Sequence, residues 1–566
     1  MKKLCSLKVA CMICVFCTAT PMLSLAQVTL TTLVRFRGLN GNWPNMVLTQ
    51  GADGNFYGTT YAGGIDYCSL GCGTVFKMTA RGTLVTLYEF CIQTGCADGN
   101  WPVGSIVQAA DGSFYGTTST GGTHGLGTLF KITPTGTLTT LYSFCAPGNC
   151  VDGREPGGGL VQGRNGSFYG TTMLGGFNGG GTVFEINPAG KLTTLYSFCA
   201  RTNCADGDEP SGSLLQATNG SFYGGTIFGG FGFGTIFEIT PGGHLTTLVN
   251  FDGTDGSGPS GGLIQAANGD LYGVTGAGGN SNDSECIGGC GTVFEITPAG
   301  KLTTLYNFCS LPGCSDGSQP YGPLVQGIDG NFYGTTSDYE TGNGNVFEIT
   351  PAGTLTTLYT FCSLPNCADG KLPTAGLLQA TNGTFYGTTS TGGEGEDKDG
   401  TIFSLSTGLG PFVKTQPTSA TEGTTIGIFG QGFNTSSVVQ FGGVQATVVK
   451  FSGTLLEAKV PAGALTGSVT VTTNGTTLTS NQQFRVTPQL LNFSPPGGSV
   501  GTQVTINGVG FTQATGVGFG DNVPAQFTVN SDTQITATVP SGAKTGPIGV
   551  LAKGGTGISS KTFTVN

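Results

Sequence analysis

The sequence is poor in charge, and above all in positive charge. Lysine and arginine number 22 together, aspartate and glutamate number 32, and charged residues make up only 10% of the 566 residues. The formal net charge is −10, and no basic run occurs. Binding to nucleic acid or to an anionic membrane depends on clustered Lys and Arg. We therefore expect neither kind of partner.

Histidine and long apolar runs are also scarce. The chain has two histidines, His124 and His244, in loops that we expect at opposite ends of the fold. We therefore expect neither a histidine-based triad nor a metal site with several histidines. Beyond residues 1–26, no apolar run approaches the length of a membrane span, so we expect no transmembrane segment.

Residues 1–26 have the pattern of a secretory signal peptide. Lys2 and Lys3 precede an apolar stretch, and Ser24-Leu25-Ala26 fits a small-residue cleavage site. No cysteine here sits in a lipoprotein box, so we predict no lipid anchor. The mature protein should be extracellular or on the cell surface.

The chain is rich in glycine, with 102 residues, and it repeats one phrase. "DGSFYGTT" begins at Asp111, and near copies begin at Asp53, Asn165, Asn219, Asn268, Asp329 and Asn382. The copies start roughly 50 to 60 residues apart, which is the spacing of propeller blades.

Four strands can be predicted in each repeat, and the third repeat shows them well. They are 159–162 (GLVQ), 167–172 (SFYGTT), 181–186 (GTVFEI) and 192–198 (LTTLYSF). Asn-Gly or Asp-Gly joins the first two strands, and "NPAG" or "TPAG" joins the last two, so both connections are tight hairpin turns. Four antiparallel strands of this kind make a blade.

Consecutive Phe and Tyr in "FYGTT" point to opposite faces of a strand. A blade packed between two neighbours buries both faces, so we interpret the phrase as packing between blades, with its glycine allowing close approach. The glutamine that ends the first strand is interpreted as a buried side chain bonded to backbone. It recurs at Gln50, Gln108, Gln162, Gln216, Gln265, Gln326 and Gln379.

The two ends of the repeat region are out of phase. It opens with a fourth strand (30–36) that no other strand of a repeat precedes, and it closes with a third strand (400–406) that no fourth strand follows. If the first of these completes the last blade, no edge stays open. We therefore predict an all-β fold in which residues 27–408 form a seven-bladed β-propeller closed by an N-terminal strand. An open array of sheets is the alternative.

The cysteines fall into close pairs. Four of the 18 lie in the signal peptide. In an exported protein we expect the others to form disulfides, each worth about 2 kcal/mol because the loops are short. A four-thiolate zinc site made from two pairs is the alternative. The C-x4-C pairs are Cys91 with Cys96, Cys145 with Cys150, Cys199 with Cys204, Cys309 with Cys314 and Cys362 with Cys367, and the C-x3-C pairs are Cys68 with Cys72 and Cys286 with Cys290.

The repeat "DGxFYGTT…GG…GTVFEITPxG…LTTLYSF" resembles the GloVer tandem-repeat family over residues 28–408. The resemblance implies an extracellular bacterial protein and says little about activity. Residues 411–487 and 488–566 resemble each other and the IPT/TIG domains, for example in "KVPAGALTGSVTV" and "TVPSGAKTGPIGV". That resemblance implies two immunoglobulin-like β-sandwiches, which we expect to act as a spacer or an adhesive stalk.

The long connections, from the fourth strand to the next first strand and from the second to the third, should lie at one end of the blades. Each of the former contains Asp-Gly-x-x-Pro, with Asn40 replacing Asp in the first. We interpret the aspartates as turn formers; a ring of calcium ligands or catalytic carboxylates is the alternative. They are Asp98, Asp152, Asp206, Asp255, Asp316 and Asp369.

The residue before that proline differs between repeats. It is Trp43, Trp101, Glu155 and Glu209 in the first four repeats. Trp43 and Trp101 are the only tryptophans of the chain. On adjacent blades the four should line the mouth of the central channel. Aromatic faces stack on sugar rings, and the carboxylates suit hydrogen bonds to hydroxyls or acid–base work in glycoside cleavage. Capping of their own loops by the tryptophans is the interpretation that we favour over a ligand role.

Calcium is a further possibility. Glu394, Glu396, Asp397 and Asp399 form an acidic loop that could bind it. The loop lacks the full spacing of a known calcium loop, so we favour a solvated acidic loop and assign no cofactor. Taken together, the sequence predicts a monomeric, non-enzymatic binding or adhesion protein. Its partner would be an extracellular glycan or a surface protein. An extracellular glycosidase-like enzyme is the alternative function.

Overall fold

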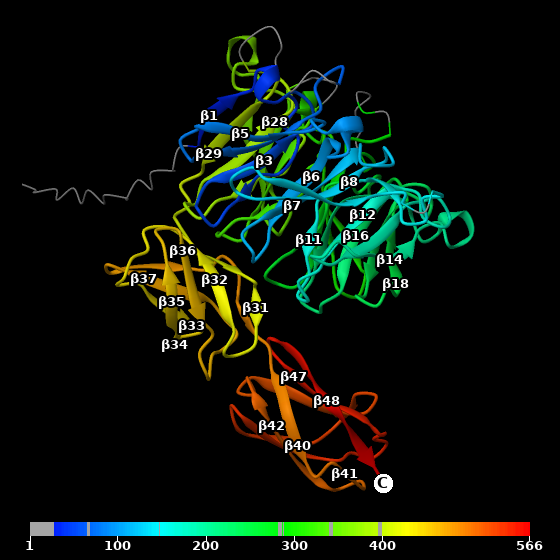
Figure 1. Cartoon of the computed structure of the whole chain (residues 1–566), viewed down its shortest axis with the longest axis vertical. Coiled ribbons are helices and arrows are strands. Elements are labelled where there is room, and N and C mark those ends of the chain that lie inside the picture. The colour runs from blue at the N-terminus through cyan, green and yellow to red at the C-terminus, as the bar shows by residue number, and fades with distance from the viewer. Residues whose placement is uncertain are drawn as a thin grey trace, which may run out of the picture.

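The computed structural model describes residues 28–64, 68–146, 148–280, 286, 288–338, 343–393 and 399–566. The signal-peptide prediction falls outside these residues. The described chain consists of strands and turns, so the all-β prediction is confirmed (Figure 1). Its helices are single 3-10 turns: η1 (Gly38–Asn40), η2 (Thr94–Cys96), η3 (Thr202–Cys204), η4 (Pro312–Cys314) and η5 (Pro365–Cys367). No helix in this part of the chain is long and apolar enough to cross a membrane.

Antiparallel sheets, numbered here 1 to 7, follow one another through the described part of residues 29–406. Sheets 1 and 2 contain β2 (Thr49–Gln50), β3 (Phe56–Thr60), β4 (Thr74–Met78) and β5 (Leu84–Glu89), then β6 (Asn100–Gln108), β7 (Phe114–Thr120), β8 (Thr128–Ile132) and β9 (Leu138–Ser143). Sheet 3 contains β10 (Arg154–Pro156), β11 (Val161–Gln162), β12 (Phe168–Leu174), β13 (Thr182–Ile186) and β14 (Leu192–Ser197).

The remaining sheets repeat this order. Sheets 4 and 5 contain β15 (Asp208–Gln216), β16 (Phe222–Phe228), β17 (Thr235–Ile239) and β18 (Leu245–Asn250), then β19 (Ile264–Gln265), β20 (Leu271–Thr275), β21 (Thr292–Ile296) and β22 (Leu302–Asn307). Sheets 6 and 7 contain β23 (Val325–Gln326), β24 (Phe332–Thr336), β25 (Asn345–Ile349) and β26 (Leu355–Thr360), then β27 (Leu378–Gln379), β28 (Phe385–Thr389), β29 (Thr401–Ser406) and β1 (Thr29–Arg35).

The "FYGTT" strands are buried on both faces, as predicted. In β3 all five residues are buried, and Tyr57 stacks on Phe114 of sheet 2 with ring centroids 4.1 Å apart. A Cβ added at Gly58 would meet the Phe76 ring at 2.6 Å, so only glycine fits there. The same Tyr–Phe contact joins the last sheet to the first, where Tyr386 meets Phe56 at 4.1 Å.

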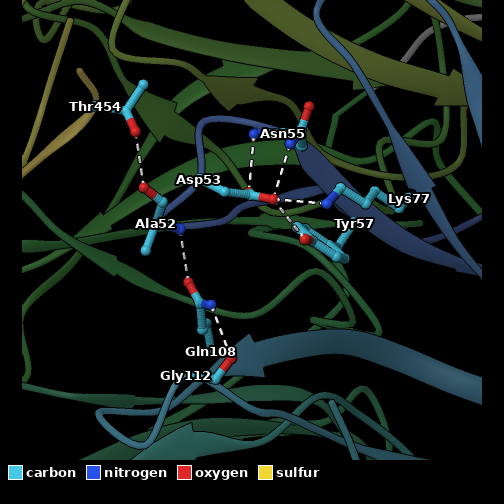
Figure 2. Close-up of polar contacts among 8 residues, drawn as sticks. All are labelled: Ala52, Asp53, Asn55, Tyr57, Lys77, Gln108, Gly112 and Thr454. Carbon is cyan, nitrogen blue, oxygen red and sulfur yellow. Dashed lines mark hydrogen bonds and ion pairs between the residues drawn. The ribbon is translucent and has the colours of Figure 1, made fainter. Parts of the chain in front are cut away.

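The recurring glutamines join neighbouring turns (Figure 2). The Gln108 side chain accepts a hydrogen bond from the Ala52 N–H of sheet 1 at 2.8 Å and donates one to Gly112 O in its own turn at 3.0 Å. Gln50 accepts in the same way from the Thr381 N–H of sheet 7, at 3.1 Å. The prediction that these side chains bind backbone is confirmed, and five of the seven glutamines bond to the preceding sheet. The prediction that they are buried is wrong for all but Gln379, because the short turns lie at the surface.

The N-terminal strand β1 pairs with β29 of the last sheet. The antiparallel register joins Thr29 to Ser406 and Arg35 to Thr401. The first strand of the chain therefore supplies the fourth strand of sheet 7, as the offset between the two ends of the repeat region predicts. The arrangement is propeller-like.

Two β-sandwiches follow, with the same strand order. The first contains β30 (Lys414–Gln416), β31 (Ser419–Ala420), β32 (Thr425–Phe429), β33 (Val438–Phe441), β34 (Val444–Gln445), β35 (Thr447–Phe451), β36 (Leu455–Lys459), β37 (Val469–Thr473), β38 (Thr476–Thr479) and β39 (Arg485–Val486). The second contains β40 (Gln489–Ser494), β41 (Gly497–Gly498), β42 (Gln503–Val509), β43 (Ala514–Phe519), β44 (Val523–Pro524), β45 (Phe527–Ser531), β46 (Gln534–Thr538), β47 (Gly546–Ala552) and β48 (Gly555–Val565). Sheet β30-β32-β36-β35 corresponds to β40-β42-β46-β45.

The first sandwich contacts the short turns between the first two strands of the sheets. Thr454 Oγ1 donates to Ala52 O at 2.9 Å (Figure 2), and Gln416 Nε2 donates to Gln108 O at 2.9 Å. In Figure 1 the sandwiches lie on this side of the sheets. The opposite side, which carries the long connections, is called the long-loop end below.

All seven predicted disulfides are present, so the cysteine pairing is confirmed. They are Cys68–Cys72, Cys91–Cys96, Cys145–Cys150, Cys199–Cys204, Cys286–Cys290, Cys309–Cys314 and Cys362–Cys367. Some of them pack against a neighbouring disulfide, and Cys286 Sγ, for example, lies 3.9 Å from Cys309 Sγ. The sulfurs weighed as a zinc site are thus close together but bonded in pairs, and they serve to fasten the long loops.

Candidate functional site

The residue before the lead-in proline, called the pre-proline residue below, occupies the same backbone position in every sheet. Its φ is positive throughout, between 53° and 63°. Its N–H donates to a carbonyl of the preceding sheet, for example Glu155 N to Leu126 O at 3.0 Å and Trp43 N to Asp399 O at 3.1 Å. The residues are Trp43, Trp101, Glu155, Glu209, Gly258, Gln319 and Leu372.

A positive φ is a strained conformation for any of these residues except glycine. It costs about 1 kcal/mol for a residue with a Cβ. Gly258 shows that the backbone position itself needs no side chain. The other side chains are therefore kept at some loss of stability, which is typical of positions used for binding or catalysis.

The two tryptophans share one aromatic neighbour, Tyr61. The Tyr61 ring lies 6.2 Å from Trp43 and 5.6 Å from Trp101, with interplanar angles of 27° and 18°. The Tyr61 N–H also donates to Trp43 O at 3.1 Å. Trp43 keeps 36% of its surface exposed. The three rings, called the aromatic stack below, form one platform at the long-loop end.

The two glutamates continue the row on sheets 3 and 4. Glu155 pairs with Arg154 at 3.2 Å. Burial raises the pKa of Glu209, and the negative charges of Asp208 and Glu155 raise it further. The Glu155 carboxylate is therefore close enough for its charge to contribute to the raised pKa of Glu209. The pre-proline residues thus carry aromatic rings on sheets 1 and 2 and acidic groups on the next two sheets, 3 and 4.

Most of the Asp-Gly-x-x-Pro aspartates lie inside their own loops. Asp316 is fully buried and accepts hydrogen bonds from Tyr306 Oη at 2.8 Å, from Ser310 N at 2.9 Å and from Leu311 N at 3.2 Å. The same tyrosine contact is made by Asp98, Asp152, Asp206 and Asp369. The turn-forming interpretation is confirmed for these aspartates, and their tyrosine partners were not predicted.

The proposed calcium loop is only partly described. Glu394, Glu396 and Asp397 lie outside the described residues. Asp399 is buried, and its carboxylate accepts a hydrogen bond from Gly38 N. Asp399 therefore helps to join sheet 7 to the loop that leads into sheet 1, and calcium binding by this loop stays a prediction.

Comparison with known proteins identifies the two parts of the chain. The model of the Gloeobacter/Verrucomicrobia repeat matches residues 22–160, 146–313 and 286–487, and that of the IPT/TIG domain matches residues 488–565. The segment 411–487, which we expected to be a first IPT/TIG domain, thus falls within the third repeat match. No curated protein matches the chain.

Several solved structures are distantly similar. A fungal alcohol oxidase in complex with copper is 14% identical, with 95% of this chain and 99% of that chain covered and a TM-score of 0.40. A gluconolactonase from Xanthomonas campestris is 14% identical, over 55% and 86%, with a TM-score of 0.32. A surface glycan-binding protein from Prevotella bryantii is 20% identical, over 28% and 39%, with a TM-score of 0.20. At these scores none of the three carries an argument about activity.

Proposed function

Because the chain belongs to the Gloeobacter/Verrucomicrobia repeat family and ends in an IPT/TIG domain, we propose that it is an extracellular, non-enzymatic binding protein. Its ligand would be a carbohydrate, bound at the long-loop end. Seven disulfides suit an oxidising compartment outside the cell. The first sandwich covers the short turns, so the long-loop end is the one that points away from the sandwiches.

The aromatic stack is the observation that carries this proposal. Trp43 and Trp101 are held on either side of Tyr61 in a strained backbone conformation. An exposed indole offers a sugar ring a large apolar face with a polar edge. The neighbouring Glu155 and Glu209 offer hydrogen-bond acceptors for its hydroxyls.

Binding of neutral glycans by the wild-type chain and by Trp43→Ala and Trp101→Ala tests the proposal. Calorimetric titration should show affinity about fivefold weaker in either variant, since a stacking contact contributes about 1 kcal/mol. Phe451→Ala, on the first sandwich and 48% exposed, is the matched control. Unchanged affinity in both tryptophan variants, or no binding by the wild type, would refute carbohydrate binding at this site.

For the architecture, we propose that sheets 1 to 7 close into a single seven-bladed β-propeller and that both sandwiches are of the IPT/TIG type, acting as a stalk. The β1–β29 pairing, the Gln50–Thr381 bond and the Phe56–Tyr386 contact support closure. Deleting residues 28–36 would leave β29 as an open edge. We expect that deletion to abolish the cooperative unfolding of the repeat region; a deletion variant with unchanged unfolding would favour an open array.

An extracellular carbohydrate-active enzyme is the second candidate. The raised pKa of Glu209, to which the charge of Glu155 contributes, is the observation that favours it, because glycoside cleavage uses a pair of carboxyl groups and the general acid of the pair has a raised pKa. Reducing-sugar release from a polysaccharide panel would support this candidate if Glu155→Gln and Glu209→Gln abolished it. Inert behaviour of the wild-type chain across the panel would remove it.

A further inference from the structure

Sheet 5 carries a gap where sheet 1 carries the aromatic stack. The pre-proline residue is Gly258, and the residue that bonds to it is Gly276, whose N–H donates to Gly258 O at 3.2 Å. In sheet 1 the same two positions hold Trp43 and Tyr61, joined by the same bond at 3.1 Å. Sheet 5 thus has glycine at both positions that sheet 1 fills with rings.

The space beside Gly258 is open. A Cβ added there would have a single neighbour within 4 Å, Ile227 Cγ2 at 4.0 Å. Leu372 holds a leucine at the equivalent position of sheet 7, with φ of 56° against 63° at Gly258. The backbone of sheet 5 is therefore able to carry a side chain, and the glycine leaves room that a ligand can occupy.

Aromatic residues from both neighbouring sheets lie against other glycines of sheet 5 and of the connection that leads into it. Phe233 O accepts from the Gly258 N–H at 2.9 Å, and the Phe233 ring lies against Gly253, where a Cβ would meet it at 3.0 Å. Tyr321 of sheet 6 lies over Gly276, where a Cβ would meet its ring at 2.5 Å. Phe233 is 41% exposed and Tyr321 is 36% exposed.

The negative charge of the glutamates between the aromatic stack and Phe233 limits the kind of ligand that can bind. The row of pre-proline residues runs from the two tryptophans through Glu155 and Glu209 to Gly258, across five consecutive sheets. Arg154 neutralises Glu155, whereas no basic partner of Glu209 is found among the described residues, and Asp208 lies beside it. Uronic acids or sulfated sugars would meet like charge here, and neutral hydroxyls would meet acceptors.

We propose that the long-loop end binds an extended neutral oligosaccharide, one part of which stacks on Trp43 and Trp101 while another part enters the space beside Gly258 next to Phe233. This inference rests on the carbohydrate binding proposed above and adds a second subsite to it. A ligand that spans both subsites gains contacts that a single sugar lacks, so affinity should depend on chain length.

Calorimetric titration with neutral linear oligosaccharides of glucose, xylose and mannose, from monosaccharide to hexasaccharide, tests the second subsite. Affinity should rise roughly fivefold or more between the shortest ligand bound and the hexasaccharide, because the second subsite adds a stacking contact of its own. Gly258→Leu, which places the side chain of Leu372 in the gap, and Phe233→Ala should each abolish that rise and leave binding of the shortest ligand unchanged. Oligogalacturonates of matched length should bind more weakly.

The possible failures separate the two proposals. If Trp43→Ala weakens binding but affinity does not depend on length and Gly258→Leu has no effect, the second subsite is refuted and the carbohydrate site stands. If no neutral ligand binds, or Trp43→Ala and Trp101→Ala change nothing, both are refuted. Phe451→Ala should behave like the wild type, and thermal unfolding of each variant checks that it is folded.

Discussion

Sheets 1 and 5 follow the same chain path and hold opposite contents. In both, the connection that leads into the first strand lacks a disulfide, and the connection between the second and third strands carries one, Cys68–Cys72 or Cys286–Cys290. In both, an isolated β-bridge also joins these two connections, Asn42 with Ala62 and Ser257 with Ala277. Yet sheet 1 projects two rings where sheet 5 has two glycines. A shared backbone in a repeat protein can therefore carry either a projecting platform or a vacant space.

The other five connections are built differently. In each, a tyrosine of the fourth strand and the N–H groups after the first cysteine bind one buried aspartate, as Tyr306 and Ser310 bind Asp316. Val34 and Val249 replace that tyrosine before sheets 1 and 5. We call the five connections with this tyrosine–aspartate contact tied loops, and the two without it, before sheets 1 and 5, untied loops. The tied loops are held by a buried aspartate, whereas the untied loops differ in the side chains that they carry. Substitutions at these positions test how far this contrast holds.

The largest expected effect is that of Asp316→Ala. It removes the acceptor of the Tyr306 hydroxyl and of two backbone N–H groups in a buried loop, so unfolding free energy should fall by about 3 kcal/mol. Asp255→Ala, in the untied loop before sheet 5, should cost less than about 1 kcal/mol, because Asp255 is half-buried and accepts from Asp252 N in an exposed turn. Urea unfolding of both variants measures the difference, and equal losses would contradict the contrast.

A smaller loss of unfolding free energy is expected when a residue of the aromatic stack is introduced at its equivalent position in sheet 5. Gly276→Tyr places the residue of Tyr61 where a Cβ would meet the Tyr321 ring at 2.5 Å, so overpacking should cost roughly 2 kcal/mol. The double variant Gly276→Tyr with Tyr321→Ala should recover most of this loss in the same unfolding measurement. Full stability of the single variant would mean that the gap in sheet 5 is not bounded by Tyr321.

A pH-dependent effect should distinguish the tied loops from the two untied ones. Burial and the Asp206 carboxylate raise the pKa of Tyr196 from 10.0 to about 12. A raised tyrosine pKa means that the neutral form stabilises the folded state, fully below about pH 10 and progressively less as the pH rises toward 12. Unfolding measured at several alkaline pH values should show this loss, and Tyr196→Phe should reduce its slope. Val249→Phe, at the untied position, should leave the slope unchanged.

The smallest effect is that of Gly258→Ala. The added Cβ meets open space, so the change in unfolding free energy should reflect the positive φ alone, at about 1 kcal/mol or less. Leu372→Gly should give a change of similar size and opposite sign if φ dominates at both positions. A loss well above about 1 kcal/mol in Gly258→Ala would show that the space is occupied in the folded chain.

Much of the fold follows from local sequence patterns. The second strand of the third repeat was predicted at 167–172 and is found at Phe168–Leu174, because hairpin turns and β-branched residues mark it locally. The first strand, predicted at 159–162, forms only at Val161–Gln162. Its start is glycine-rich, and Gly158 and Gly159 pack against the backbone of neighbouring sheets instead. Such approach between sheets has no local signature.

The site was predictable only in part. Trp43 and Trp101 stood out because they share one place in the repeat. Tyr61 did not stand out, because no recurring residue type marks its position in the repeats. Its counterpart in sheet 5, for example, is Gly276. The proposed role of Gly258 depends on the space that the surrounding side chains leave beside it, and that space cannot be derived from the sequence. The tyrosine–aspartate contacts did have a signal, the joint loss of tyrosine and cysteine in the two untied loops.

The pairing of β1 with β29 bears on how the protein is made. The strand synthesised first finds its partner only after Ser406 has emerged, when nearly the whole repeat region already exists. Until then the leading segment must stay unpaired while the later sheets take shape behind it. A product truncated before Thr401 would expose the edge of β28 and the lone leading strand together, and it would be prone to join other unfinished chains through both.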